Sequence, residues 1–338
     1  MKRIFILVAI ALLTVGLVFA EEAVLIDFGK LAADIIPNQN NVPTQNRATM
    51  MDFSTTVGGS FTTEQKSAMK TSLAITNWDI VLASSSRTVI NQSQSYTQEA
   101  PSKQWGTVMG VRIHFPVEPF NSWARIKPPF EIPAFEDPAE IDDDGNIEYA
   151  EGNNSMTQKR FENGFGVVKN VGTIKSLAVN AYGLNFPHGL STVLIDSQGN
   201  EQVIFMGYLN YDGWGELVWQ NPAYVQAVRN RELRLYPLYP TNTPFVKFAG
   251  FLIQRDAAKE GGDFVGYFKD VKIIYDKAVL DTERDIDDEA LWGIIKIRED
   301  AKQKFEMNRF GNNQVLRYLE IQKQATEGGF TPTPTNEE

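Results

Sequence analysis

The segment SLAVNAYG at residues 176–183 indicates most directly which fold this chain adopts. Successive side chains of a β-strand point to opposite faces, so a strand with one face in the core alternates apolar and polar residues. One set here is Leu177, Val179 and Ala181, and the other is Ser176, Asn180 and Tyr182. The segment therefore predicts a half-buried strand.

A β-hairpin is predicted directly after this strand. Short apolar runs at 193–195 and 203–206 flank the sequence DSQGN at 196–200. Gly199 lies within that turn, and glycine adopts the positive φ angles that tight hairpin turns require. Two antiparallel strands joined by this turn are expected.

Further strands are expected on both sides of the hairpin. Apolar or alternating segments occur at 24–28, 73–83, 105–115, 248–253 and 271–275. Many short strands without intervening helices are typical of two packed antiparallel sheets. We therefore predict an all-β fold, a two-sheet antiparallel sandwich, over residues 21–280. Six prolines between 116 and 138, followed by acidic residues, predict a surface excursion over about 116–160.

The C-terminal part predicts an α-helical extension over residues 281–326. Acidic residues at 287–289 suit a helix start, where unpaired N–H groups carry partial positive charge. Leu291, Ile294 and Ile295 then recur at helical spacing.

Gly311 is expected to cap that helix, and a second helix is expected from 313 to 325 with Leu319 on its apolar side. Residues 327–338 have the composition of a disordered tail. The extension packs either on its own sandwich or on a neighbouring molecule, and the pattern leaves both open.

The first twenty residues have the pattern of a secretory signal peptide. Lys2 and Arg3 precede an apolar run at 4–19, and cleavage is expected between Ala20 and Glu21. The alternative is an uncleaved membrane anchor, for which the run is short. No later apolar run has the length of a membrane span. The sequence thus predicts export.

The composition excludes several classes of function. The formal net charge is −10, and without Lys2 and Arg3 it becomes −10 − 2 = −12, so phosphate backbones and anionic lipid are poor partners. Nucleic acid is therefore not expected as a partner. The chain contains no cysteine, which excludes thiol catalysis and thiolate metal sites.

Catalytic groups are scarce. The two histidines are His114, on an expected strand, and His188, in an expected turn. No nucleophile elbow, zinc-binding HExxH helix or phosphate-binding glycine loop is present in the sequence. We predict no enzymatic activity, no catalytic residues and no cofactor.

The acidic segment EIDDDGNIEYAE at 140–151 has two interpretations. Set against a calcium-binding loop, Asp142, Asp144 and Glu151 fall on ligand positions. The nearby prolines oppose the flanking helices of an EF-hand, and a solvated acidic loop without calcium is the favoured interpretation.

Aromatic residues are concentrated between 208 and 239. They are Tyr208, Tyr211, Trp214, Trp219, Tyr224, Tyr236 and Tyr239. Such side chains fill a core, bury in a protein interface or stack on sugar rings. About half, Trp219 above all, are expected in the core.

Several strings of the sequence resemble one known family. They are FENGFGVVKNVGTIKSL at 161–177, GLNFPHGL at 183–190, RNRELRLYPLYP at 229–240, FAGF at 248–251, GGDF at 261–264 and KDVKIIYD at 269–276. These strings resemble the spirochaete periplasmic flagellar filament outer-layer, or sheath, proteins. The segment at 268–273 is also similar to the last strand of galactose-binding-like jelly rolls.

The resemblance implies a structural subunit in the periplasm that coats a flagellin-type filament core beside other sheath subunits and affects filament stiffness and shape. Interface candidates are Tyr208, Tyr211, Trp214, Tyr236, Tyr239, Leu291, Ile294, Ile295 and Leu319. The alternative is a periplasmic carbohydrate-binding module that recognises glycan on the filament core or cell wall.

Overall fold

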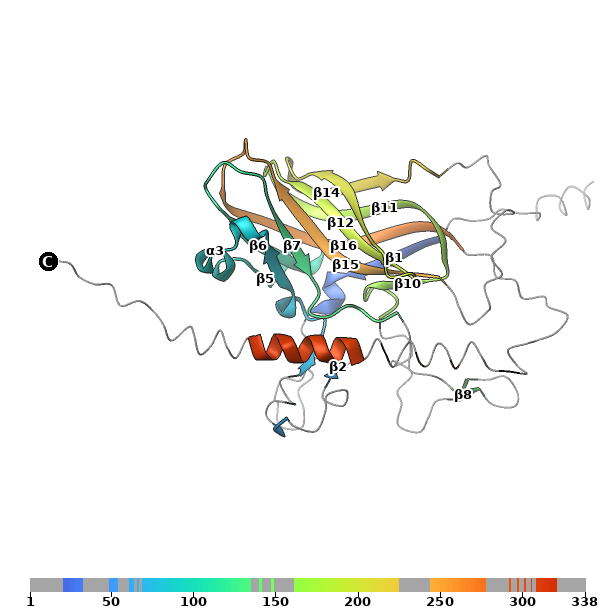
Figure 1. The fold of residues 1–338 in the computed structure, drawn as a ribbon. Coiled ribbons are helices and arrows are strands. Elements are labelled where there is room, and N and C mark those ends of the chain that lie inside the picture. The colour runs from blue at the N-terminus through green and yellow to red at the C-terminus, as the bar shows by residue number, and fades with distance from the viewer. Residues whose placement is uncertain are drawn as a thin grey trace, which may run out of the picture.

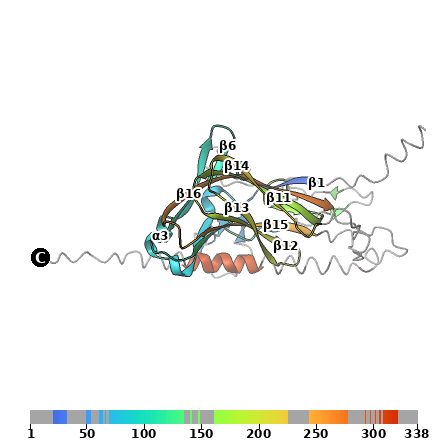
Figure 2. The ribbon, with the colours of Figure 1, turned by 90° about the horizontal axis from the view of Figure 1, so that it is seen from above.

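The structure is a computed structural model. It describes residues 21–32, 49–53, 61–63, 66, 69–134, 140–141, 147–148, 161–224 and 244–277, and in the C-terminal part residues 292, 297, 301, 305 and 308–320. Two antiparallel sheets pack face to face (Figure 1), and Figure 2 shows one above the other. The predicted all-β, two-sheet sandwich is confirmed.

The first sheet, called sheet I here, is built around the long strand β16. Its order is β14 (Asp212–Gln220), β11 (Val171–Leu184), β16 (Gly262–Lys277), β6 (Gly106–Phe115) and β5 (Tyr96–Ser102), with β1 (Glu21–Asp27) also paired to β16. The β1 and β6 strands share one edge of β16, because β6 pairs with its first half and β1 with its second half.

The second sheet, called sheet II, is built around β15. Its order is β13 (Glu201–Tyr208), β12 (Gly189–Asp196), β15 (Phe245–Arg255), β7 (Ser122–Lys127) and β4 (Asp79–Leu82), with β10 (Val167–Lys169) also paired to β15. Short two-residue pairs are formed by β2 (Met51–Asp52) with β3 (Lys70–Thr71), and by β8 (Glu140–Ile141) with β9 (Ile147–Glu148). Short helices are η1 (Phe28–Leu31), η3 (Ile75–Asn77), η4 (Ser84–Ser86) and α3 (Val89–Ser93).

The core lies between the sheets and is rich in phenylalanine. Leu177, Val179 and Ala181 of β11 are buried in it, as their alternation predicted. Phe251 of sheet II stacks on Phe268 of sheet I with ring centroids 4.5 Å apart. Ring packing across the layer therefore joins the two sheets.

The predicted hairpin turn is confirmed between β12 and β13. The Asp196 carboxylate accepts hydrogen bonds from the backbone N–H groups of Gln198 and Asn200, each at 2.9 Å. Gly199 has a φ of 84°. Asp196 and Gly199 thus supply the local chemistry that the turn needs.

The predicted surface excursion over 116–160 is wrong for part of its length. Strand β7 lies inside this range and pairs with both β15 and β4. Its Ala124 and Ile126 side chains are fully buried. The prolines lie on either side of 122–127 and leave the N–H groups of the strand free to pair, so they bound a strand and do not exclude one.

The C-terminal helical extension also differs from its prediction. Residues 308–320 form one helix that runs through Gly311, so the predicted helix end at Gly311 is wrong. Figure 1 shows this helix in red along the sandwich. Gly311 is buried, and the neighbouring Phe310 is 3 % exposed within the core cluster. Gly311 therefore lies inside the helix, in the turn that packs on the sandwich, and does not cap the helix.

Two arginines hold the same helix against its own sandwich. Arg317 donates to the Pro129 carbonyl at 2.9 Å and to the Asp79 carboxylate at 2.7 Å. Arg309 pairs at 2.7 Å with Glu131, which also pairs with Lys247 of β15. The helix at 308–320 therefore packs on its own molecule. The sequence had left open whether this segment packs on its own sandwich or on a neighbouring molecule.

Candidate interaction surfaces

Four aromatic rings form a row on the outer face of sheet I, called the aromatic row here. Trp214 lies opposite Tyr182, which lies opposite Tyr267. The Tyr182 ring is 5.4 Å from Trp214 and 5.9 Å from Tyr267, centroid to centroid. Trp105, in the turn between β5 and β6, places its ring 6.3 Å from that of Trp214. Figure 2 shows this hairpin projecting from the sandwich near β14.

The aromatic row combines apolar area with polar neighbours. Its contacts are edge-to-face, which leaves ring area accessible, and Trp105 is 40 % exposed. On the same face the Asn180 amide donates to the Asp270 carboxylate at 2.8 Å. Aromatic rings beside amide and carboxylate groups can bury in a protein interface or stack on sugar rings.

A second exposed surface lies on the outer face of sheet II, and we call it the β13 stripe. It consists of Val203, Phe205 and Tyr208, which are 56 %, 46 % and 58 % exposed. The Phe205 and Tyr208 rings contact at 5.3 Å. A contiguous apolar surface of this kind is typical of interaction sites.

Beside the β13 stripe, the surface of sheet II is covered by packed side chains and by an ion pair. Val193 and Ile195 of β12 form a small buried cluster with Ala249 of β15. The Arg125 guanidinium makes two hydrogen bonds to the Glu201 carboxylate. Arg125 belongs to β7 and Glu201 to β13, so this pair reaches across the two strands between them.

The structure separates the aromatic residues that the sequence placed in one group. Tyr208 faces outward from sheet II, whereas Trp214 faces outward from sheet I. Tyr211 lies half-buried between them and donates from its hydroxyl to the Ala181 carbonyl at 3.2 Å. Burial raises the pKa of the Tyr211 hydroxyl. Tyr211 therefore packs in the turn between the sheets. Trp219, which was expected in the core, is half-buried and packs against the core.

Other predicted residues fall outside the described residues. These are Ala20, Asp142, Asp144, Glu151, Tyr236, Tyr239, Leu291, Ile294 and Ile295. Of the rest, Leu319 is 40 % exposed on the C-terminal helix, and Glu21 begins β1 opposite Tyr275. In the same C-terminal part, the helical residues Trp292, Ile297 and Phe305 are each about 70 % exposed.

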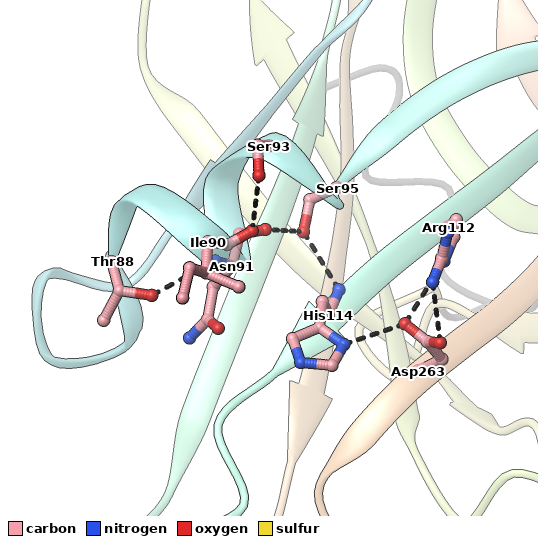
Figure 3. A network of polar contacts seen from close by, with 8 residues as sticks. All are labelled: Thr88, Ile90, Asn91, Ser93, Ser95, Arg112, His114 and Asp263. Carbon is pink, nitrogen blue, oxygen red and sulfur yellow. Dashed lines mark hydrogen bonds and ion pairs between the residues drawn. The ribbon is translucent and has the colours of Figure 1, made fainter. Parts of the chain in front are cut away.

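A polar network joins α3 to sheet I beside its outer face (Figure 3). The Asp263 carboxylate accepts hydrogen bonds from the Arg112 guanidinium and pairs with His114 Nδ1 at 2.8 Å. The His114 backbone N–H donates to Ser95 Oγ, which in turn donates to the carbonyl of Asn91 in α3. Hydrogen bonds from Arg112 and then His114 lower the pKa of Asp263. These groups satisfy one another, which is typical of a structural role.

Two kinds of site are not found in the part of the chain that the structure describes. No group of three or more histidine, aspartate or glutamate residues there is arranged to hold a metal ion. No helix among those residues is long and apolar enough to cross a membrane.

Comparison with known proteins identifies the family. The family model described as "Flagellar filament outer layer protein Flaa" matches residues 43–284. A flagellar filament outer layer protein of Treponema pallidum (strain Nichols) is 51 % identical over 340 residues, covering 98 % of this chain and 97 % of that protein. One from Spirochaeta aurantia is 48 % identical over 337 residues, covering 98 % and 95 %. One from Borreliella burgdorferi is 27 % identical over 277 residues, covering 80 % and 73 %.

Solved structures are far less similar. TmCBM61 in complex with beta-1,4-galactotriose aligns with a TM-score of 0.27 and 8 % identity, covering 59 % of this chain and 88 % of that chain. A score this low carries no argument about function. In contrast, the family model and the two relatives that span nearly the whole length all indicate the same family. The chain belongs to the flagellar filament outer layer protein family.

Proposed function

We propose that this chain is a structural subunit of the outer layer of a spirochaete flagellar filament in the periplasm, where it coats a flagellin-type core beside other layer subunits. The observation that carries the proposal is family membership across 98 % of the chain at 51 % identity. The proposal includes no enzymatic step.

The architecture suits a subunit that stiffens a filament. Two sheets joined by packed rings resist deformation, because protein interiors are close-packed and transmit strain. A layer forms when each copy makes contacts that do not close on themselves. Individually weak contacts are sufficient, since a filament presents many neighbouring sites and raises their effective concentration.

We place the contact with the filament on the β13 stripe. Val203→Asp puts a charge into this apolar surface, and we expect its apparent affinity for purified filament cores to fall about 10-fold, which corresponds to about 1.4 kcal/mol. Co-sedimentation of the purified chain with filament cores, followed over a range of concentrations, measures the change.

Val89→Asp is the matched control. Val89 is 88 % exposed at the start of α3, where an acidic side chain is tolerated, and the same substitution there is expected to leave co-sedimentation unchanged. If both variants bind cores like the unmodified chain, the stripe is not the contact. If the unmodified chain itself does not bind filaments, the layer function is wrong.

A second candidate function is glycan recognition, and the aromatic row favours it. Trp214→Ala removes the ring that joins Trp105 to Tyr182, and we expect it to weaken binding of neutral oligosaccharides at least 10-fold. Titration calorimetry with soluble oligosaccharides measures the effect. Trp123→Ala is the control, because Trp123 is similarly exposed, at 42 %, on sheet II. Absence of saturable binding to the unmodified chain contradicts this candidate.

A further inference from the structure

Strand β14 forms one edge of sheet I, and among the described residues it pairs with β11 alone, in one continuous register. At one end of this ladder the Asn221 N–H donates to the Lys175 carbonyl, and at the other end the Asn185 N–H donates to the Tyr211 carbonyl. Backbone groups along an antiparallel strand point alternately to its two sides. The odd-numbered residues of β14 therefore bond to β11, and the even-numbered residues point their N–H and C=O groups to the open edge.

An open row of backbone donors and acceptors is complementary to another extended strand. A strand laid beside such an edge forms the same ladder as inside a sheet, and side chains of the two strands then add specificity. The even-numbered residues Glu216, Val218 and Gln220 are exposed, and Val218 is 49 % exposed. The open side of β14 is thus accessible to a strand from another molecule.

Apolar side chains lie at the same edge on both faces of β14. Leu217 and Trp219 are half-buried and pack against the core from the inner face. Val218 lies on the outer face. The strand contains no lysine, arginine or proline, which commonly protect exposed edges, and its charged residues are Asp212 and Glu216. A second strand beside β14 would cover apolar surface in addition to forming hydrogen bonds.

The edge strands β5 and β4 are protected. Strand β5 contains Pro101, which has no N–H, and its Thr97 hydroxyl donates to the Ile75 carbonyl of η3. Strand β4 has four residues, and the Gln92 side chain of α3 donates to the carbonyl of Ile80 in this strand at 2.7 Å. Proline, short length and covering elements are common means of protecting a sheet edge.

The other edges of the two large sheets are short, bonded or bent. Strand β10 has three residues. Strand β1 is bonded along its second half, since the Asp27 N–H donates to the Gly164 carbonyl and the Gly166 N–H donates to the Leu25 carbonyl. Strand β13 has a register shift beside Gly207, whose φ is 143°, and such a bulge bends a strand. Within the described residues, β14 is therefore the edge of sheets I and II that is straight and uncovered over its whole length.

We propose that β14 pairs with β14 of a second copy of this chain, antiparallel about a two-fold axis, so that sheet I continues from one molecule into the other. A contact between identical surfaces closes after two copies, and two-fold dimers are the commonest protein oligomers. Because the other edges are protected, the strand that matches β14 over its whole length is β14 of another copy. This inference goes beyond the layer function, which concerns the contact of the β13 stripe with the filament.

The charges on β14 select the register of this pairing. Glu216 opposite Glu216 of the second copy would place like charges together, which is unfavourable. A register with Leu217 on the two-fold axis sets Glu216 opposite Val218 of the second copy and keeps residues 214–220 in the ladder. It also leaves Asp212 beyond the ladder, whereas the opposite shift places Asp212 diagonal to Glu216 of the second copy. We therefore place the axis at Leu217, where two apolar side chains meet.

The size of the contact sets the expected strength of the dimer. A standard interface buries about 800 Å² on each partner, and one pairing of strands over residues 214–220 is smaller than that. We therefore expect a reversible dimer that dissociates at micromolar concentrations. On a filament the neighbouring copies raise one another's effective concentration, so a contact of this strength is sufficient there.

Sedimentation of the purified chain over a wide range of concentrations, without filament cores, measures the dimer. Val218→Lys puts a charge at the open edge, and its backbone bonds to β11 are not affected because the groups of this residue point away from β11. We expect this variant to raise the dimer dissociation constant at least 10-fold. Val117→Lys is the matched control, because Val117 is 77 % exposed between β6 and β7, and it should dimerise like the unmodified chain.

A single engineered cysteine tests the register, since the chain contains no cysteine of its own. On the two-fold axis Leu217 lies opposite itself in a non-hydrogen-bonded pair, with Cα atoms about 4.5 Å apart. This separation is within the range of about 4.4–6.8 Å that disulfides span. Leu217→Cys is expected to form a covalent dimer on mild oxidation with copper phenanthroline, read on a non-reducing gel, whereas Val117→Cys stays monomeric.

Four results would overturn the proposal. The first is a purified chain that stays monomeric at its highest soluble concentration, as expected if the edge takes a strand of another protein. The second is equal dimerisation of Val218→Lys and the unmodified chain. The third is a loss of dimer in Val203→Lys as large as in Val218→Lys, which would mean that β14 pairs with β13. The fourth is a folded Leu217→Cys variant that gives no covalent dimer.

The dimer and the layer function fail independently. Sedimentation and cross-linking contain no filament cores, so a monomeric chain that still co-sediments with cores would contradict the dimer alone. A dimer that does not bind cores would contradict the layer function alone.

Discussion

Replacing Arg255 with methionine is expected to lower the free energy of unfolding by about 3–5 kcal/mol. Arg255 is 2 % exposed, and its guanidinium is the donor for the carbonyls of Pro116, Glu118 and Lys259. Methionine fills part of the space but leaves these acceptors without their donor. Urea unfolding followed by tryptophan fluorescence measures the loss, with the slope of the transition checked for two-state behaviour.

Arg125→Met is the matched control for this prediction. Arg125 makes its two hydrogen bonds to a side chain instead, the exposed Glu201 carboxylate on the outer face of sheet II. An exposed ion pair typically contributes about 0–1 kcal/mol, so the control should lose no more than that. Equal losses in the two variants would contradict the role assigned to Arg255.

Replacing Gly250 with alanine is expected to cost about 4 kcal/mol or to prevent folding. Gly250 has a φ of 121°, which is strained for any residue with a Cβ. An added Cβ would lie 2.0 Å from the Ile126 carbonyl oxygen of β7. Relief of this clash moves β15 away from β7 and breaks their ladder. Thermal and urea unfolding of the purified variant measure the loss.

Gly199→Ala separates the clash from the backbone strain. Gly199 also has a positive φ, of 84°, but nothing lies within 4 Å of an added Cβ. At Gly199 only the strain of the positive φ remains, and we expect the variant to lose about 1–2 kcal/mol of unfolding free energy. A Gly250 variant no less stable than the Gly199 variant would mean that β15 can shift without loss.

The site of Gly250 matters because it shapes sheet II. The pairing of β12 with β15 shifts register between Val193 and Leu194, opposite Gly250 and Phe248. Such a bulge bends a strand and increases its twist. The buried cluster of Val193, Ile195 and Ala249 lies at this bulge, beside the exposed stripe on β13. The shape of the proposed contact surface therefore depends on a local backbone irregularity.

Local signals in the sequence predicted the central strands of both sheets, but they gave no prediction for β5, β7, β10 and β14. Alternation at 176–183, the turn residues at 196–200 and the apolar run at 271–275 all lie where β11, the β12–β13 turn and β16 are found. The sequence does not predict strand β7 because six residues between prolines carry a weak periodic signal. The strand is stabilised by its pairing with β15 and β4 and by the burial of Ala124 and Ile126. The helix through Gly311 was misjudged because its packing on the sandwich outweighs the local tendency of glycine to end a helix.

The candidate surfaces were predictable only in part. Tyr208 and Trp214 were correctly chosen as aromatic candidates, but they face outward from different sheets. Trp105 joins Trp214 although the two lie more than a hundred residues apart in the chain. His188 lies in the connection between β11 and β12, in agreement with the expected turn, but the sequence did not predict that its ring is buried among three phenylalanine rings.

The sequence by itself determined the all-β fold class, the hairpin of β12 and β13 and the family, because these depend on side-chain period, turn chemistry and short strings of residues. Tertiary structure alone decided the order of strands in the two sheets, the partners of Arg255 and the surroundings of His188. Those features arise from contacts between residues distant in the chain, and such contacts leave no periodic pattern in any one segment.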